Sequence, residues 1–141
     1  MPLVSKTGRV VTERVDGSKC EYSKSSLVLF RRILDYIHPS EHKDVFFATH
    51  NGEFKLGRSY YDFKYKKKLI EFSGNFFHQD PRIYSKTDKM MAHFASAIWA
   101  KDKEKKELAE KEGFELIVVW EDSYSKEPTI VLQKCINFIL S

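Results

Sequence analysis

A lysine-rich turn within residues 60–73 is the feature that most constrains the fold of this 141-residue chain. If Lys66 and Lys67 form a two-residue hairpin turn, the flanking segments pair as antiparallel strands. Directly paired residues project from the same face of a sheet, so Asp62 and Glu71 are expected to lie close enough to share one cation. The predicted register pairs Tyr65 with Lys68, Lys64 with Leu69, Phe63 with Ile70, and Asp62 with Glu71.

A histidine follows the paired carboxylates, because His78 lies seven residues after Glu71. Magnesium prefers oxygen ligands and keeps several waters, so Asp62, Glu71 and a phosphate oxygen would complete its shell. A neutral histidine, with an ordinary pKa of about 6.5, accepts a proton from water at physiological pH. The set suits metal-assisted phosphodiester hydrolysis with Mg²⁺ or another divalent cation such as Mn²⁺. The alternatives are acids salt-bridged to Lys64 or Lys68, and a loop histidine bonded to nearby backbone.

Lysines cluster beside these acids and again on a later segment, although the net charge is only +4. Basic groups attract a polyanion and release its counterions. An enzyme that acts on a phosphate substrate needs acids to hold a metal and lysines to attract the phosphate. The alternative is that both groups of lysines only form solvated surfaces. On the later segment, Lys103 and Glu107 have the spacing of an ion pair on a helix. The two groups are Lys64, Lys66, Lys67 and Lys68, and Lys101, Lys103, Lys105 and Lys106, with Asp102 among the second.

The length of the chain suits one domain with one core, and an aromatic fraction of 14% supplies a packed interior. No apolar run approaches the roughly 20 residues that span a bilayer, and the first residues lack a signal-peptide core. Cys20 and Cys135 lie near opposite ends, as expected of reduced thiols. We therefore expect a cytoplasmic protein with no membrane partner, an N-terminal arm at 1–24 and a single domain at 25–141.

The pattern of apolar residues predicts helices around a strand-rich middle. Ser25 and Ser26 are expected to cap the first helix, and the apolar run at 114–120 is expected to form a buried central strand. A hairpin and a later strand flanked by helices imply an α/β or α+β sandwich. The predicted elements are a helix at 26–38, a strand at 45–49, a tight turn at Asn51-Gly52 leading into 53–56, a hairpin at 59–73, a loop at 74–87, a helix at 88–112, a strand at 114–120 and a closing helix from about 130.

The stretch Ile-Glu-Phe-Ser-Gly-Asn-Phe-Phe-His at 70–78, with Pro-Arg-Ile-Tyr at 81–84, carries a family resemblance. It resembles the catalytic segment of very-short-patch repair endonucleases and, more closely, homing endonucleases named for their EDxHD motif. Both belong to the restriction-endonuclease-like superfamily. The resemblance continues at 99–105 and 112–121 and covers about residues 58–121. It implies an α/β fold with a small mixed central sheet, a carboxylate-bearing hairpin and flanking helices, and metal-dependent cleavage of double-stranded DNA.

The resemblance also implies roles for individual residues. Asp62 would be the main metal ligand, Glu71 would take the second acidic position of the hairpin, and His78 would be the general base or orient the attacking water. Ser73 stands where many members of the superfamily keep a lysine, which suggests that His78 takes over the activation of water.

Two further acids complete the motif by resemblance. Asp102 on the long helix would be its final acid, although Asp80 competes for that place. Glu21 is the candidate for its first glutamate, although the first helix itself begins with Ser25 and Ser26 where that acid would be sought.

Several residues are expected to contact DNA because of their charge or their aromatic rings. Aromatic side chains in a loop can stack on bases or wedge between them, whereas core packing is the alternative for Phe76 and Phe77. The residues expected to contact DNA are Lys66, Lys67, Lys68, Phe76, Phe77, Arg82, Lys101 and Lys105.

The expected partner is double-stranded DNA. Recognition of a long site needs more surface than one compact domain provides, so we expect either a homodimer or a DNA-recognition domain outside this chain. Two other functions compete with the endonuclease: a catalytically silent DNA-binding module on a nuclease scaffold, and a small protein–protein interaction domain whose lysines only aid solubility.

Overall fold

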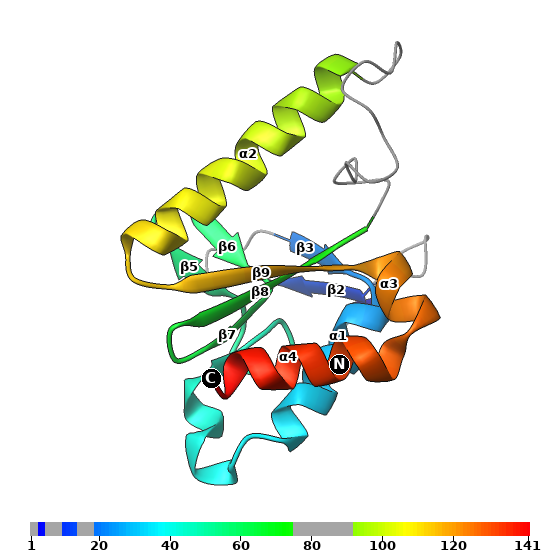
Figure 1. Ribbon diagram of the computed structural model, residues 1–141, viewed down its shortest axis with the longest axis vertical. Coiled ribbons are helices and arrows are strands. Elements are labelled where there is room, and N and C mark those ends of the chain that lie inside the picture. Colours follow the sequence, from blue (N-terminus) through cyan, green and yellow to red (C-terminus); the bar gives the residue numbers. More distant parts are fainter. Residues whose placement is uncertain (1–2, 5–9, 14–18, 75–91) are drawn as a thin grey trace.

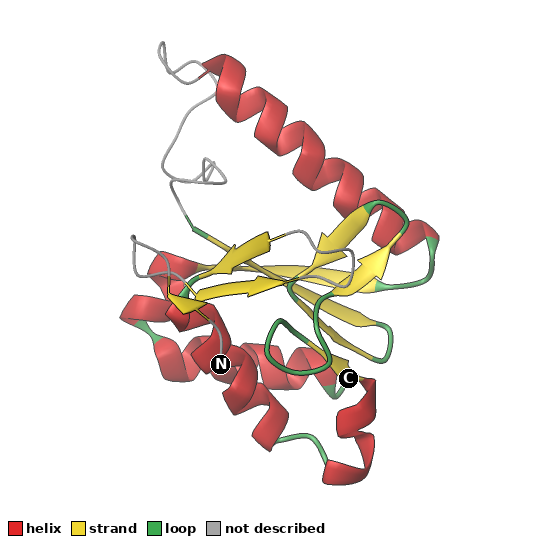
Figure 2. Cartoon of the chain, turned by 180° about the vertical axis from the view of Figure 1, so that it is seen from behind, coloured by secondary structure: helices red, strands yellow, loops and turns green. Residues whose placement is uncertain are grey.

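The structure of the chain is a computed structural model of a mixed α/β protein (Figure 1). A small sheet lies in the middle, with α2 (Ala92–Lys111) over one face and both α1 (Lys24–Asp35) and α4 (Pro128–Ile139) on the other. Seen from behind, the sheet separates α2 from the other helices (Figure 2). The described residues are 3–4, 10–13, 19–74 and 92–141.

The central sheet has the order β4-β7-β8-β9. Its strands are β4 (Val45–Phe46), β7 (Phe63–Tyr65), β8 (Lys68–Ser73) and β9 (Glu115–Trp120). β7 runs antiparallel to both β4 and β8, whereas β9 runs parallel to β8. A parallel pair needs a crossover connection, and α2 lies within the segment that joins these two strands. The expectation of a small mixed sheet flanked by helices is therefore confirmed.

Three of the four strand pairs predicted for the β7–β8 hairpin are present, whereas the fourth, Asp62 with Glu71, is not a strand pair because β7 begins at Phe63. The three pairs are Phe63 with Ile70, Lys64 with Leu69 and Tyr65 with Lys68. Lys66 adopts a φ of 51°, and such a positive φ is what a two-residue hairpin turn requires. The turn therefore fixes which side chains share a face of the sheet.

The first helix begins and ends earlier than the sequence predicts. Its cap is Ser23, whose side chain accepts a hydrogen bond of 3.1 Å from the backbone N–H of Ser26. The prediction of Ser25 and Ser26 as the cap is wrong, because any serine in this run can supply the accepting oxygen. A 3₁₀ helix, Pro39–Asp44, follows α1 and leads into β4.

The strand predicted at 45–49 is shorter, since β4 ends at Phe46. Phe47 and His50 then exchange two backbone hydrogen bonds of 3.0 and 2.8 Å, which close a tight turn. The segment after the turn forms β5 (Phe54–Leu56), which pairs with β6 (Ser59–Tyr61) rather than with β4.

Near the N-terminus, the segment expected as an arm contributes three short antiparallel strands. These strands are β1 (Leu3–Val4), β2 (Val10–Glu13) and β3 (Lys19–Tyr22).

The apolar run of β9 does not form the buried central strand that the sequence predicts. Among the described strands, β9 lies at the edge of its sheet, and Val118 is 44% exposed. The run is apolar because α2 packs on one face of β9 while α3 (Glu121–Lys126) and α4 adjoin its other side. Burial of the two faces does not require a strand on each edge.

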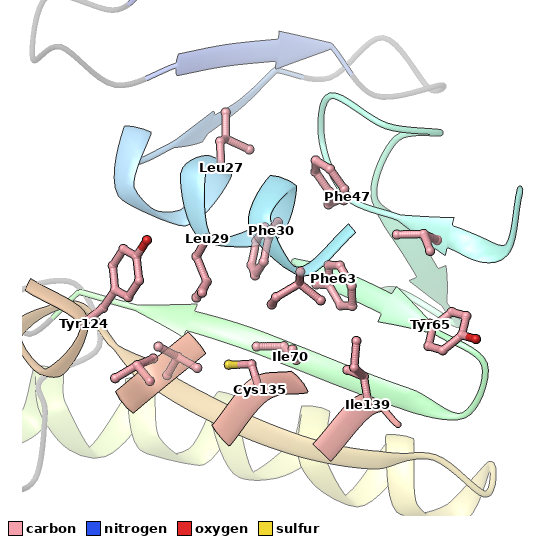
Figure 3. Close-up of a cluster of buried hydrophobic side chains, with 14 of the residues drawn as sticks. Leu27, Leu29, Phe30, Phe47, Phe63, Tyr65, Ile70, Tyr124, Cys135 and Ile139 are labelled. Carbon is pink, nitrogen blue, oxygen red and sulfur yellow. The ribbon is translucent and has the colours of Figure 1, made fainter. Parts of the chain in front are cut away.

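Alternation along β8 divides the interior into two clusters. Ile70 faces α1 and α4 and belongs to the larger cluster, in which the rings of Phe30 and Phe63 lie 5.3 Å apart (Figure 3). Leu69 points the other way and packs with Ala109 of α2. Because side chains in a strand alternate between faces, Glu71 is placed on the α2 side, as Leu69 is. The fold thus brings this acid under the long helix.

Candidate functional site

Asp62 and Glu71 meet at the open end of the hairpin, as the register predicts. The backbone N–H of Asp62 donates a hydrogen bond of 3.1 Å to Oε1 of Glu71. The backbone N–H of Phe72 donates one of 2.8 Å to Oδ2 of Asp62. Each carboxylate is therefore held by backbone beside the other one. Glu71 is buried and Asp62 is partly buried, so neither is the freely solvated acid of an exposed strand pair.

Lys105 of α2 supplies the countercharge to this pair. Its Nζ lies 2.9 Å from Oε2 of Glu71 and 5.0 Å from the centroid of the Tyr61 ring. The Tyr61 hydroxyl donates a hydrogen bond of 2.7 Å to the backbone carbonyl of Lys105. α2 is thus joined to β6 through Tyr61 and to β8 through Glu71, and both contacts involve Lys105.

Burial and like charge shape the titration of the pair. Burial, together with the neighbouring Glu71 carboxylate, raises the pKa of Asp62 to about 8. Burial also raises the pKa of Glu71, although contact with Lys105 works in the opposite direction. Burial would lower the pKa of Lys105, but the Glu71 charge outweighs it and the pKa is raised. One ammonium therefore does not fully offset two buried carboxylates, and perturbed acids of this kind are typical of functional sites.

A cleft of ≈ 280 Å³ opens between α2 and the strands β8 and β9 beside Glu71. Asp102 lies close enough for its charge to oppose ionisation of Glu71. The structure thus brings Asp102 and Lys105 to the hairpin acids, as a site on α2 requires. The residues that line the cleft are Glu71, Ser73, Trp99, Asp102, Lys103, Lys105, Lys106, Leu116, Val118 and Trp120.

The lysines of the hairpin tip do not flank the carboxylates, and that expectation is wrong. Lys67 precedes Glu71 by four residues along an extended strand, a separation of about 13 Å. Its ammonium lies 4.3 Å from the centroid of the Phe114 ring. Lys68 pairs with Glu115 at 2.8 Å. Closeness in sequence therefore did not mean closeness in space, because the strand carries the acids away from the turn.

The remaining lysines fall into two groups. Lys64 pairs with Asp44, so neither Lys64 nor Lys68 bonds to the paired acids. On α2, Lys101 is exposed, and Lys103 forms the predicted ion pair with Glu107 at 3.8 Å.

Several predicted site residues fall in 75–91, outside the described residues. These are Phe76, Phe77, His78, Asp80 and Arg82. Glu21 lies in β3, where its backbone pairs with Val11, and its side chain is not described. Within the described ranges, no group of three or more His, Cys, Asp and Glu side chains is arranged to hold a metal ion. Asp62 and Glu71 therefore stand as a pair in this part of the chain.

The sequence interpretation missed two features of the site. Lys105 was expected to contact DNA, whereas the structure pairs it with Glu71. Lys105 lies four residues before Ala109, which puts both on the inner face of α2, but the burial of Ala109 is known only from the structure, so the sequence carried no signal for this contact. Trp99 and Trp120 both line the cleft, although Trp120 was expected to be core.

Fold and site together define a mixed α/β protein with a small mixed sheet, flanking helices and a buried carboxylate pair that is capped by a lysine. Comparison of the chain with family models, curated proteins and solved structures finds no match. None of the helices in the described part has the length and apolar character needed to cross a membrane.

Proposed function

We propose that this chain is a metal-dependent endonuclease that hydrolyses phosphodiester bonds in double-stranded DNA. The observation that carries the proposal is the Asp62–Glu71 pair, two acids with raised pKa values at the end of a hairpin under Lys105. The order of hairpin, helix and parallel strand supports a restriction-endonuclease-like fold for the domain. Lysines and acids around one cleft suit a phosphate substrate.

The residues present fit a divalent cation. Oδ1 of Asp62 accepts no hydrogen bond from the residues that the structure describes, so it is available as a ligand. Oxygen donors of this type suit Mg²⁺ or Mn²⁺. When both acids are ionised, Lys105 offsets only one of the two negative charges, and a bound divalent ion would balance the other. Asp62 and Glu71 would hold it.

The chemistry proposed for the site is hydrolysis. A bound Mg²⁺ would supply Lewis-acid polarisation of the phosphate. Water would attack phosphorus, so that one P–O bond forms while the ester P–O bond breaks. His78, proposed from the sequence, would take the proton of the water, and the leaving oxygen would gain a proton from solvent. Lys105 would keep Glu71 ionised and oriented, and Lys103 and Lys106 would contact the phosphate backbone.

A second function is favoured by one specific observation. The described residues provide two acids and no third ligand for a metal. A DNA-binding module that kept the nuclease scaffold without activity would show the same arrangement. Such a module would bind DNA with the same dependence on salt but would leave it uncut.

Conversion of supercoiled plasmid in Mg²⁺ or in EDTA separates these functions. We expect the wild type to nick or linearise plasmid only with the metal, and Asp62→Asn to lose at least about a hundredfold in rate. Glu115→Gln is the matched control, because it removes an equal charge from an exposed position outside the cleft. A silent module would retard the plasmid on a gel without cutting it. Full metal-dependent cleavage by Asp62→Asn would overturn the endonuclease proposal.

A further inference from the structure

The chain has two tryptophans, and both line the cleft beside Glu71. Trp99 comes from α2 and Trp120 from the last position of β9. Both residues are partly buried rather than fully enclosed in the core, and each contributes surface to the lining of the cleft. Two indoles from separate elements therefore converge on one site that adjoins the buried acids.

The walls and the rim of the cleft differ in character. Leu116 and Val118 add apolar surface to the wall of the cleft, whereas Lys103 and Lys106 are exposed cations on α2. The volume of ≈ 280 Å³ is near the lower limit of small-ligand pockets. It has room for a ring system with its immediate substituents, and it is too small for a helix or a duplex.

Charge complementarity indicates the occupant. Three lysines, Lys103, Lys105 and Lys106, line the cleft against two acids, Glu71 and Asp102. A planar apolar ring with phosphate on either side matches this combination of aromatic walls and cationic rim. Base–aromatic stacking is tolerant of sequence because every base has a π-face.

We propose that the cleft binds one unpaired nucleobase of a nucleic-acid strand, stacked against Trp99 or Trp120, with Lys103 and Lys106 on the adjacent phosphates. This inference rests on the proposed endonuclease function and narrows its substrate. The preferred DNA would present an extruded or unpaired nucleotide next to the bond that is cut. Moving a base out of the stack costs the least free energy where the base is mismatched or already single-stranded.

Intrinsic fluorescence tests the proposal directly, since Trp99 and Trp120 account for all tryptophan emission. The full chain in EDTA is titrated with a single-stranded oligomer of 15 thymidines and with a 15-mer of the same backbone that lacks every base. We expect the thymidine oligomer to quench emission saturably and to bind at least about tenfold tighter, the equivalent of one stacked base. Equal quenching and equal affinity for the two oligomers would overturn the proposal.

A pair of variants ties the result to the cleft. Val118→Glu places a carboxylate on the wall at a residue that is 44% exposed, so the fold should tolerate it. We expect this variant to lose the preference for the oligomer with bases. Ile130→Glu, at a residue of α4 that is 50% exposed and outside the cleft, should retain it. Equal loss in both variants would assign the preference to another surface.

The two proposals fail in different ways. If plasmid is cut but the oligomers bind alike, the cleft proposal is overturned and the endonuclease stands. If the oligomer with bases is preferred but plasmid is never cut with Mg²⁺, the cleft proposal is supported and the endonuclease is overturned.

Discussion

The acidic side chains at the two ends of the β7–β8 hairpin have pKa values shifted in opposite directions. At the tip, Lys66 Nζ lies 3.3 Å from Oε2 of Glu41, and a hydrogen bond from Tyr65 lowers the pKa of Glu41. At the open end, burial and mutual repulsion raise the pKa of Asp62, and burial raises that of Glu71. One hairpin thus favours an ionised acid at its tip and disfavours ionised acids at its other end.

The contrast separates charged groups whose placement is explained by the stability of the fold from those whose placement is not. Opposite charges at an exposed tip are screened by water and contribute little, so their pairing needs no further reason. Two acids that are buried against each other oppose folding whenever both are ionised. An arrangement that costs stability, and that is held by two backbone hydrogen bonds and a lysine, points to binding or catalysis.

Among the substitutions considered, removal of Lys105 at the open end of the hairpin should lower the stability of the protein the most. Lys105→Met leaves two buried acids without their countercharge. At pH 8 we expect the free energy of unfolding to fall by about 2–3 kcal/mol. This is less than the loss expected for a fully buried ion pair, because the lysine side chain is 26% exposed. Urea denaturation measures this change. Lys103→Met is the matched control on the same helix, where the side chain is 78% exposed, and should leave the free energy unchanged.

A double variant checks the cause. Glu71→Gln in the Lys105→Met background removes one of the two like charges and should recover most of the lost stability. If it lowers stability further, the loss in Lys105→Met reflects packing of the lysine stem rather than charge.

The pH dependence of stability should differ in sign from that of an ordinary surface acid. The folded pKa of Asp62 is raised from 3.8 to about 8, so its contribution is fully present below pH 3.8 and is lost as pH rises through about 8. Metal-free protein should lose about 2 kcal/mol between pH 6 and pH 8. Asp62→Asn should show a flatter profile in the same urea series. An equal slope in both proteins would mean that Asp62 is not the titrating group.

The smallest effect is expected at the tip. Lys66 is 60% exposed and its partner Glu41 is 41% exposed. Lys66→Gln should therefore shift the melting temperature by no more than about one degree, as measured by circular dichroism. A shift as large as that of Lys105→Met would remove the contrast between the two ends of the hairpin.

The parts of the fold that local physics determines could be predicted from the sequence. The hairpin register follows from the Lys66-Lys67 turn and from the alternation of side chains, and the structure has it. Which strands become neighbours depends on long-range competition, so neither the pairing of β5 with β6 nor the edge position of β9 could be predicted. An apolar run indicates that neighbouring elements pack on the faces of a strand, but it does not indicate whether another strand pairs with each of its edges.

The site was predictable only in part for a similar reason. Counting along the hairpin placed Asp62 opposite Glu71, and a short-range geometric rule was enough for that. Lys105 could not be assigned, because its contact with Glu71 depends on where α2 crosses the sheet. The cleft also requires that crossing, since Trp99 and Trp120 are brought together by it. The role of His78 remains a prediction.

The central claim is that a divalent cation binds between Asp62 and Glu71, and calorimetric titration with Mn²⁺ at pH 7 tests it most directly. Because the pKa of Asp62 is about 8, binding should release close to one proton, which two buffers of different ionisation enthalpy reveal. We predict one site with proton release in the wild type and in the tip variant Glu41→Gln, and no such site in Asp62→Asn. Binding of equal affinity and stoichiometry by Asp62→Asn would contradict the account.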